Sequence, residues 1–154
     1  MNVAELDAAI GDTERAFIDT SVCIAFHSQD EVAHPLARHL FQRIEDGADP
    51  LVGYLSVITA AELLVRPMRT AGPDLVVMHR FLRRLANLCV VDVDFEIAHQ
   101  AANIRALTRL QLADTLIVAT AIMSGCQAIV TNDESWSRRL SPLFPQFRWI
   151  YLGR

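Results

Sequence analysis

The feature that most constrains the fold is a series of short apolar segments separated by longer segments with helical patterns. Segments such as LCVV and AIVT do not alternate apolar with polar residues, as a strand with one face in water would. Continuously apolar strands are typical of a parallel sheet that helices cover on both faces. The sequence therefore predicts an α/β fold: a three-layer α/β/α sandwich with a mostly parallel sheet of about five strands.

The expected strands alternate with the expected helices along almost the whole chain. We expect strands at residues 15–19, 51–55, 88–93, 127–131 and 147–151. We expect a short helix at 20–26 and further helices at 32–46, 57–66, 74–86, 95–108, 115–124 and 134–140. Pro67 is expected to end the helix at 57–66, because proline lacks the N–H that a helix interior needs. Residues 1–14 form a polar leader that could be helical, ahead of one domain over residues 15–151.

The composition is that of a soluble domain without a membrane anchor. A chain of 154 residues fits one domain. No apolar run approaches the ~18 residues of a membrane span, and the first fifteen residues lack the basic start and apolar block of a signal peptide. We therefore expect a cytoplasmic protein. The odd number of cysteines and their wide spacing favour buried thiols at Cys23, Cys89 and Cys126 over a disulfide or a zinc site.

All 14 basic residues are arginines, so the chain has no lysine. This excludes a Walker A lysine and a Schiff-base lysine. The formal net charge of −4 argues against nucleic acid as a partner. Setting aside four candidate metal-binding acids leaves 14 of the 18 acids against 14 arginines. The charge balance therefore neither supports nor excludes RNA as a substrate.

Two acids follow expected strands. Asp19 ends the strand at 15–19 and Asp133 comes after the strand at 127–131. Because ligands of parallel sheets bind beyond the carboxyl ends of the strands, both acids are candidates for one site. Each also has a structural alternative. Asp19 could cap the following helix, and Thr131 with Glu134 fits the T-x-x-E pattern of a capping box.

Two further acids stand at helices. Asp114 directly precedes the apolar helix expected at 115–124 and could be its N-cap. Glu62 is the only charged residue in SVITAAELLV, where no amide needs a cap. A buried carboxylate without a cation would cost several kcal/mol, so we expect a cation near it. Arg66, four residues later, is the structural alternative for that cation.

Together the four carboxylates predict a metal site. Carboxylates gathered in one cleft repel one another and have raised pKa values unless a metal neutralises them. Oxygen ligands without histidine or cysteine select Mg²⁺ or Mn²⁺ over Zn²⁺. The candidate ligands are Asp19, Glu62, Asp114 and Asp133.

These segments resemble a known family. FIDTSV, the glutamate of TAAELL, LADTLIVATA, and IVTND followed by Trp136 resemble the four acidic motifs of PIN domains, and most closely those of VapC-type toxin ribonucleases. The resemblance covers residues 15–151 and departs from the family in the leader of residues 1–14. It implies catalytic and metal-binding roles for the four acids. It also implies supporting roles for nearby polar residues, namely Thr20, Ser21, Thr131 and Asn132.

The resemblance implies a Mg²⁺- or Mn²⁺-dependent endoribonuclease that is the toxin of a toxin–antitoxin pair. Its implied partners are RNA, a cognate antitoxin and a second copy of the chain. One alternative is a non-catalytic PIN-fold binding module, although such a module is expected to lose acids. Another is a haloacid-dehalogenase-type phosphatase. That enzyme needs a second acid where this chain has Ser21, and a lysine that the chain lacks.

Two other patterns have alternative interpretations. The helix at 32–46 carries an apolar stripe that is either core or part of a partner-binding groove: Leu36, Leu40, Phe41 and Ile44. Arginines at positions 80, 83 and 84 form either a solvated helix face or a phosphate-binding stripe. Arg138 and Arg139, close after Asp133, are the better candidates for contacts with substrate.

Overall fold

The structure is a computed structural model that describes residues 1–47, 50–70 and 72–153. The described residues include five strands: β1 (Arg15–Ile18), β2 (Val52–Ser56), β3 (Leu88–Val91), β4 (Ala128–Thr131) and β5 (Arg148–Tyr151). They form one sheet in the order β3-β2-β1-β4-β5, and every pair is parallel. The predicted parallel sheet is therefore confirmed.

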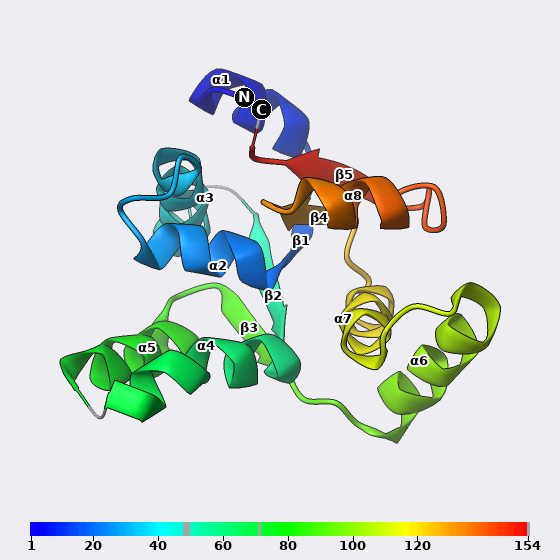
Figure 1. The fold of residues 1–154 in the computed structure, drawn as a ribbon. Helices are drawn as coiled ribbons and strands as arrows, with labels where there is room; N and C mark the ends of the chain where they lie inside the picture. Colours follow the sequence, from blue (N-terminus) through cyan, green and yellow to red (C-terminus); the bar gives the residue numbers. More distant parts are fainter. Residues whose placement is uncertain (48–49, 71, 154) are drawn as a thin grey trace.

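Helices cover both faces of the sheet (Figure 1). They are α1 (Val3–Ile10), α2 (Thr20–His27), α3 (His34–Asp46), α4 (Val57–Thr70), α5 (Pro73–Arg84), α6 (Phe95–Thr108), α7 (Leu112–Met123) and α8 (Glu134–Leu140). One core cluster joins the sheet to helices α1 to α5, and a second joins its other face to α6, α7 and α8. This arrangement confirms the three-layer α/β/α sandwich.

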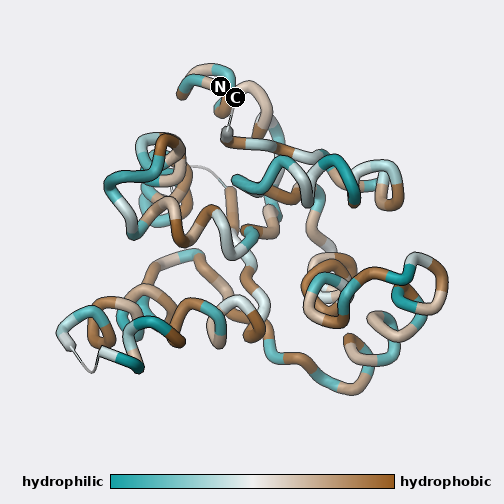
Figure 2. The backbone as a smooth tube through the Cα atoms, viewed as in Figure 1, coloured by the Kyte–Doolittle hydropathy of each residue, from teal (hydrophilic) through white to brown (hydrophobic). Residues whose placement is uncertain are grey.

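The apolar strands serve these two cores at once. Phe17 of β1 and Ile129 of β4 pack in the cluster with α6, α7 and α8. Their neighbours Ala16, Ile18 and Val130 pack in the other cluster. Side chains alternate between the faces of a strand, so consecutive positions must all be apolar. Figure 2 shows hydrophobic residues along the central strands and α7, and hydrophilic ones on α8.

Several helix boundaries differ from expectation by one or two residues, and two boundaries, the end of α4 and the start of α7, differ by more. Helix α4 does not end at Pro67 but continues to Thr70. The Pro67 ring is buried, and the Thr70 hydroxyl donates to the Pro67 carbonyl (3.2 Å), which stabilises the turn beyond the proline. Helix α7 begins at Leu112, earlier than expected, and the Thr115 hydroxyl donates to the Leu112 carbonyl (2.8 Å) within that first turn.

Burial decides several of the open alternatives. The apolar stripe of α3 is core, since all four of its residues are buried. Cys23 and Cys126 are buried, but the expected burial of Cys89 is wrong, because β3 is the edge strand of the sheet. None of the helices within the described residues is both long and apolar enough to cross a membrane.

Candidate active site

The candidate site begins where the strand order reverses. From β1, the chain first adds β2 and β3 on one side and later adds β4 and β5 on the other. Ligands of such folds bind in the crevice between the carboxyl ends of the two central strands. Asp19 follows β1 directly, and Asp133 follows β4 after one intervening residue. The fold thus brings both acids to one rim.

Asp19 is a buried carboxylate that two hydroxyl groups hold. Its exposed fraction is 8%. The hydroxyls of Ser21 and Thr131 (2.9 Å) both donate to Asp19 Oδ2. The alternative role as helix cap is not seen, since its side chain accepts no capping hydrogen bond. Burial raises the pKa of Asp19, and the hydroxyl hydrogen bonds only partly oppose this.

The same hydroxyls connect the ends of β1 and β4. The Thr131 hydroxyl oxygen accepts from the Asp133 backbone N–H (3.0 Å). The Ser21 hydroxyl oxygen accepts from the Asn132 backbone N–H (2.9 Å). Ser21 and Thr131 therefore lie where supporting residues were expected. Asn132 contributes through its backbone amide.

Asp133 is the N-cap of α8. Its Oδ1 accepts from the Trp136 backbone N–H (3.1 Å) and from the Ser135 hydroxyl (2.7 Å). The Ser135 hydrogen bond lowers the pKa of Asp133, and the Trp136 amide adds to the effect. The alternative of a capping box with Thr131 as the N-cap and Glu134 as its partner is wrong, because the N-cap of α8 is Asp133.

Glu62 lies on the solvent side of α4 and not in the core. The expectation of a buried Glu62 is wrong because its side of α4 is exposed, while the next residue, Leu63, enters the core. The Thr20 hydroxyl donates to Glu62 Oε2 (2.6 Å) and lies 3.1 Å from the Thr59 hydroxyl. Among the described residues, Arg66 makes no ion pair with Glu62, so the expected structural alternative is absent too.

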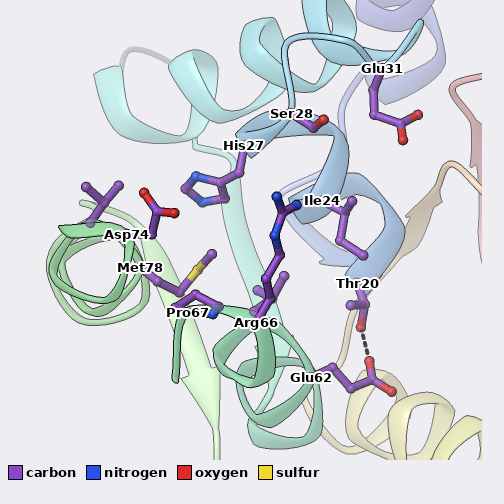
Figure 3. Close-up of a pocket in the computed structure, with 12 residues that line it drawn as sticks. Thr20, Ile24, His27, Ser28, Glu31, Glu62, Arg66, Pro67, Asp74 and Met78 are labelled. Carbon is purple, nitrogen blue, oxygen red and sulfur yellow. Dashed lines mark hydrogen bonds between the residues drawn. The ribbon is translucent and has the colours of Figure 1, made fainter. Parts of the chain in front are cut away.

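A cavity of about 690 Å³ starts at Thr20 and Glu62 and extends between α2, α4 and α5. In Figure 3, the Glu62 side chain points toward Thr20, whereas the Arg66 side chain points away from Glu62 across the cavity. The opposite walls contain Ile24 and Met78. The acidic rim therefore continues into a groove with an apolar wall and one arginine.

Asp114 lies in the first turn of α7 and is not its N-cap, because that position belongs to Gln111. Two donors from α8 reach its carboxylate. Trp136 Nε1 donates to Oδ1 (3.2 Å), and Arg139 Nη2 donates to Oδ2 (2.7 Å). Asp114 thus connects α7 to the helix that Asp133 caps.

Three contacts of this network were not expected: those of Thr59, Trp136 and Arg139. Thr59 precedes Glu62 by three residues in one helix, a spacing that places two side chains on one face and could have signalled the contact. The contacts of Trp136 and Arg139 with Asp114 span 22 and 25 residues. No local pattern in the sequence indicates them.

The oxygen atoms of the four candidate acids are the ligand type that a hard divalent cation prefers, but their side chains are not gathered around one point. All four candidates offer carboxylate oxygens, and the buried Asp19 has no cationic partner among the described residues. Charge buried in this way is typical of a cation ligand. In the part of the chain that the structure describes, however, no group of three or more His, Cys, Asp or Glu side chains could hold a metal ion.

A comparison with family models covers most of the chain. The family model of the PIN domain matches residues 16–139, from β1 to α8. The chain belongs to the PIN domain family. The match contains the four acids and the hydroxyl groups that connect them. No curated protein sequence matches this PIN domain.

Solved structures share the architecture of this PIN domain. VapC20 of Mycobacterium tuberculosis, a sarcin–ricin loop cleaving toxin, is 21% identical with a TM-score of 0.61, over 80% of this chain and 93% of VapC20. A toxin–antitoxin complex from Klebsiella pneumoniae is 19% identical with a TM-score of 0.64, over 90% of this chain and 98% of that chain. VapBC2 of Rickettsia felis, bound to a promoter DNA fragment, is 15% identical with a TM-score of 0.61, over 89% of this chain and 98% of that chain. At these identities the similarity shows the fold.

Proposed function

We propose that this PIN domain is a Mg²⁺- or Mn²⁺-dependent endoribonuclease and the toxin of a toxin–antitoxin pair. One observation carries the proposal. At the reversal of strand order, the buried carboxylate of Asp19, which has no cationic partner among the described residues, is connected by hydroxyl groups to the strand that leads to Asp133. Such a carboxylate is costly for the fold and useful as a metal ligand.

In this proposal, Asp19, Glu62, Asp114 and Asp133 hold the cation. Thr20 positions Glu62, and Ser21 and Thr131 position Asp19 through their hydrogen bonds. A bound divalent cation would lower the pKa of a water molecule and neutralise charge at the phosphate.

The chain's own residues orient these groups before any ligand binds. The hydroxyl groups of Ser21 and Thr131 both donate to Oδ2 of Asp19, and no side chain of the described residues donates to Oδ1. Glu62 and Asp133 are exposed and would face the approaching RNA. Arg66 lies in the adjoining cavity, where its guanidinium could contact a phosphate of the strand.

The similar structures support the proposed partners. The Klebsiella pneumoniae structure is a toxin–antitoxin complex, and VapC20 is a toxin that cleaves the sarcin–ricin loop. On that basis we propose that this PIN domain also has an antitoxin partner and an RNA substrate. A homodimer and a cytoplasmic location belong to the same proposal.

The decisive experiment measures RNA cleavage by the purified protein in Mg²⁺, in Mn²⁺ and in excess EDTA. We expect cleavage only with metal, and a loss on the order of a hundredfold or more in Asp19→Asn. Asp12→Asn is the matched control, because Asp12 is 92% exposed in its side chain and pairs with Arg148 away from the rim. Full activity in EDTA would exclude the metal mechanism.

The same experiment separates the enzyme from a non-catalytic PIN-fold binding module. A binding module would retain RNA in Mg²⁺ without cutting it, and Asp19→Asn would not change the products. The phosphatase alternative has no support at the site, since Ser21 occupies the position of its second acid and donates to Asp19.

A further inference from the structure

Helix α8 supplies a cation to the candidate metal site. The Arg139 guanidinium donates to Asp114 Oδ2 at 2.7 Å, while Trp136 Nε1 occupies Oδ1 at 3.2 Å. Both oxygens of Asp114 therefore already have donors from one helix. Among the four candidate ligands, Asp114 is the one that pairs with an arginine in the described structure.

The helix that carries Arg139 also carries a second candidate ligand at its start. Asp133 is the N-cap of α8, and Arg139 lies in the last turn of the same helix. One short helix therefore connects the arginine that pairs with Asp114 to the position of Asp133.

We infer that Arg139 is an internal counter-cation of the site, and that a divalent ion must displace its guanidinium from Asp114 in order to bind there. The inference rests on the proposed function.

The contact is built in a way that permits displacement. The Arg139 side chain is 50% exposed, so its guanidinium can move into water without crossing the core. Exposed ion pairs contribute little to folding. After Arg139 leaves, the hydrogen bond from Trp136 still positions Asp114. Arg139 is therefore a positioning residue that sets how tightly the metal binds.

The first test is the dissociation constant for Mn²⁺, measured by calorimetry on the full chain. Arg139→Gln should bind Mn²⁺ about three- to fivefold more tightly than the wild type, because a competing cation is removed. Arg138→Gln is the matched control: Arg138 precedes Arg139, is 74% exposed, and lies 4.0 Å from Glu134. It removes the same charge and should leave the dissociation constant unchanged. Arg139→Lys should lie between the wild type and the glutamine variant.

The outcomes separate this inference from the proposed function. If wild type and Arg139→Gln bind Mn²⁺ equally, or the variant binds more weakly, the inference is overturned while the metal site stands. If neither protein binds Mn²⁺, both are overturned. Binding by Arg139→Gln alone would support the inference.

A second measurement needs no variant and so does not depend on how the substitutions fold. Phenylglyoxal labels accessible guanidinium groups, and mass spectrometry reports each arginine. Adding Mg²⁺ to the wild type should increase the labelling of Arg139 about twofold or more, since the half-exposed group becomes fully accessible. Labelling of Arg138 should not change. Unchanged Arg139 labelling at a metal concentration that saturates the site would overturn the inference.

Discussion

At the scale of single residues, Asp19 and Asp133 show how the surroundings of a carboxyl group set its pKa. Both follow central strands, yet burial raises the pKa of Asp19, whereas the Ser135 hydroxyl lowers the pKa of Asp133. The pKa of Asp19 is raised, as expected for one of the four acids, but its first cause is the loss of water on burial.

This difference predicts the pH dependence of an Asp19→Asn variant in EDTA. Since the folded pKa of Asp19 is raised, the folded protein retains the proton more tightly than the unfolded chain, so wild-type stability is lost as pH rises from 3.8 through the folded pKa. Urea unfolding at about pH 4 and pH 7 should therefore show that the unfolding free energy of Asp19→Asn, relative to the wild type, increases with pH. The increase should be about 1.4 kcal/mol for each unit by which the folded pKa of Asp19 exceeds its unfolded pKa.

Asp12→Asn is the control for this pH effect. The hydrogen bond from Arg148 lowers the pKa of Asp12, so the stability of the wild type relative to this variant should rise as pH rises toward 3.8 and then stay nearly constant up to pH 7. A gap between wild type and Asp19→Asn that stays constant with pH, or that moves in the same direction as for Asp12→Asn, would contradict the assignment.

At the scale of elements, the short helix α8 depends on its ends and contacts. It has 7 residues, which is too few for independent stability. Asp133 caps its first turn, and the Trp136 and Arg139 side chains attach it to Asp114 of α7. The helix thus holds two candidate ligands in relation to each other.

We predict that the cap and the carboxylate of Asp133 can be separated. Asp133→Ala should lose about 1 kcal/mol of unfolding free energy together with RNA cleavage. Asp133→Ser keeps a capping oxygen, so its stability should approach that of the wild type while cleavage stays low. Thermal melts and a cleavage assay on both variants measure this.

Asp94 offers a matched cap outside the rim, since its side chain accepts from the Ile97 backbone N–H (2.9 Å) at the start of α6. Asp94→Ala should lose similar stability and retain cleavage. Full cleavage by Asp133→Ser would show that Asp133 serves only as a cap.

At the scale of the whole molecule, α1 is integrated with the rest of the fold. Leu6 and Ile10 are fully buried, and Asp7 pairs with His39 (2.8 Å) and Arg43 (2.7 Å) of α3. Figure 1 shows α1 beside β5, near both ends of the chain. The segment described as a polar leader therefore completes the core on the side of α3 and β5.

Leu6→Ala should lower the unfolding free energy by about 2–5 kcal/mol, because it leaves a cavity in a fully buried position. Val3→Ala is the control on the same helix, with Val3 41% exposed, and should change stability by less than about 0.5 kcal/mol. Cleavage per folded molecule should match the wild type in both, as measured after urea titration. A loss of stability similar to that of Val3→Ala would mean that α1 contributes little to the core.

The sequence by itself determined the layers, the parallel strands and the order of the acids. Residues buried on both faces of a sheet must be apolar at consecutive positions, and segments such as AIVT record that requirement directly. Helix α6 begins at Phe95 and ends at Thr108 as expected, because Asp94 provides a local cap. These signals lie within a few residues of the structure that they specify.

Tertiary structure alone decided which acids are buried and which are paired. Nothing near Glu62 in the sequence shows that its side of α4 faces water, and nothing near Asp114 predicts Arg139, 25 residues away. Exposure and ion pairing depend on which element packs against which. Local propensity sets the elements, whereas the packing of distant helices sets the water and the charge around each carboxylate.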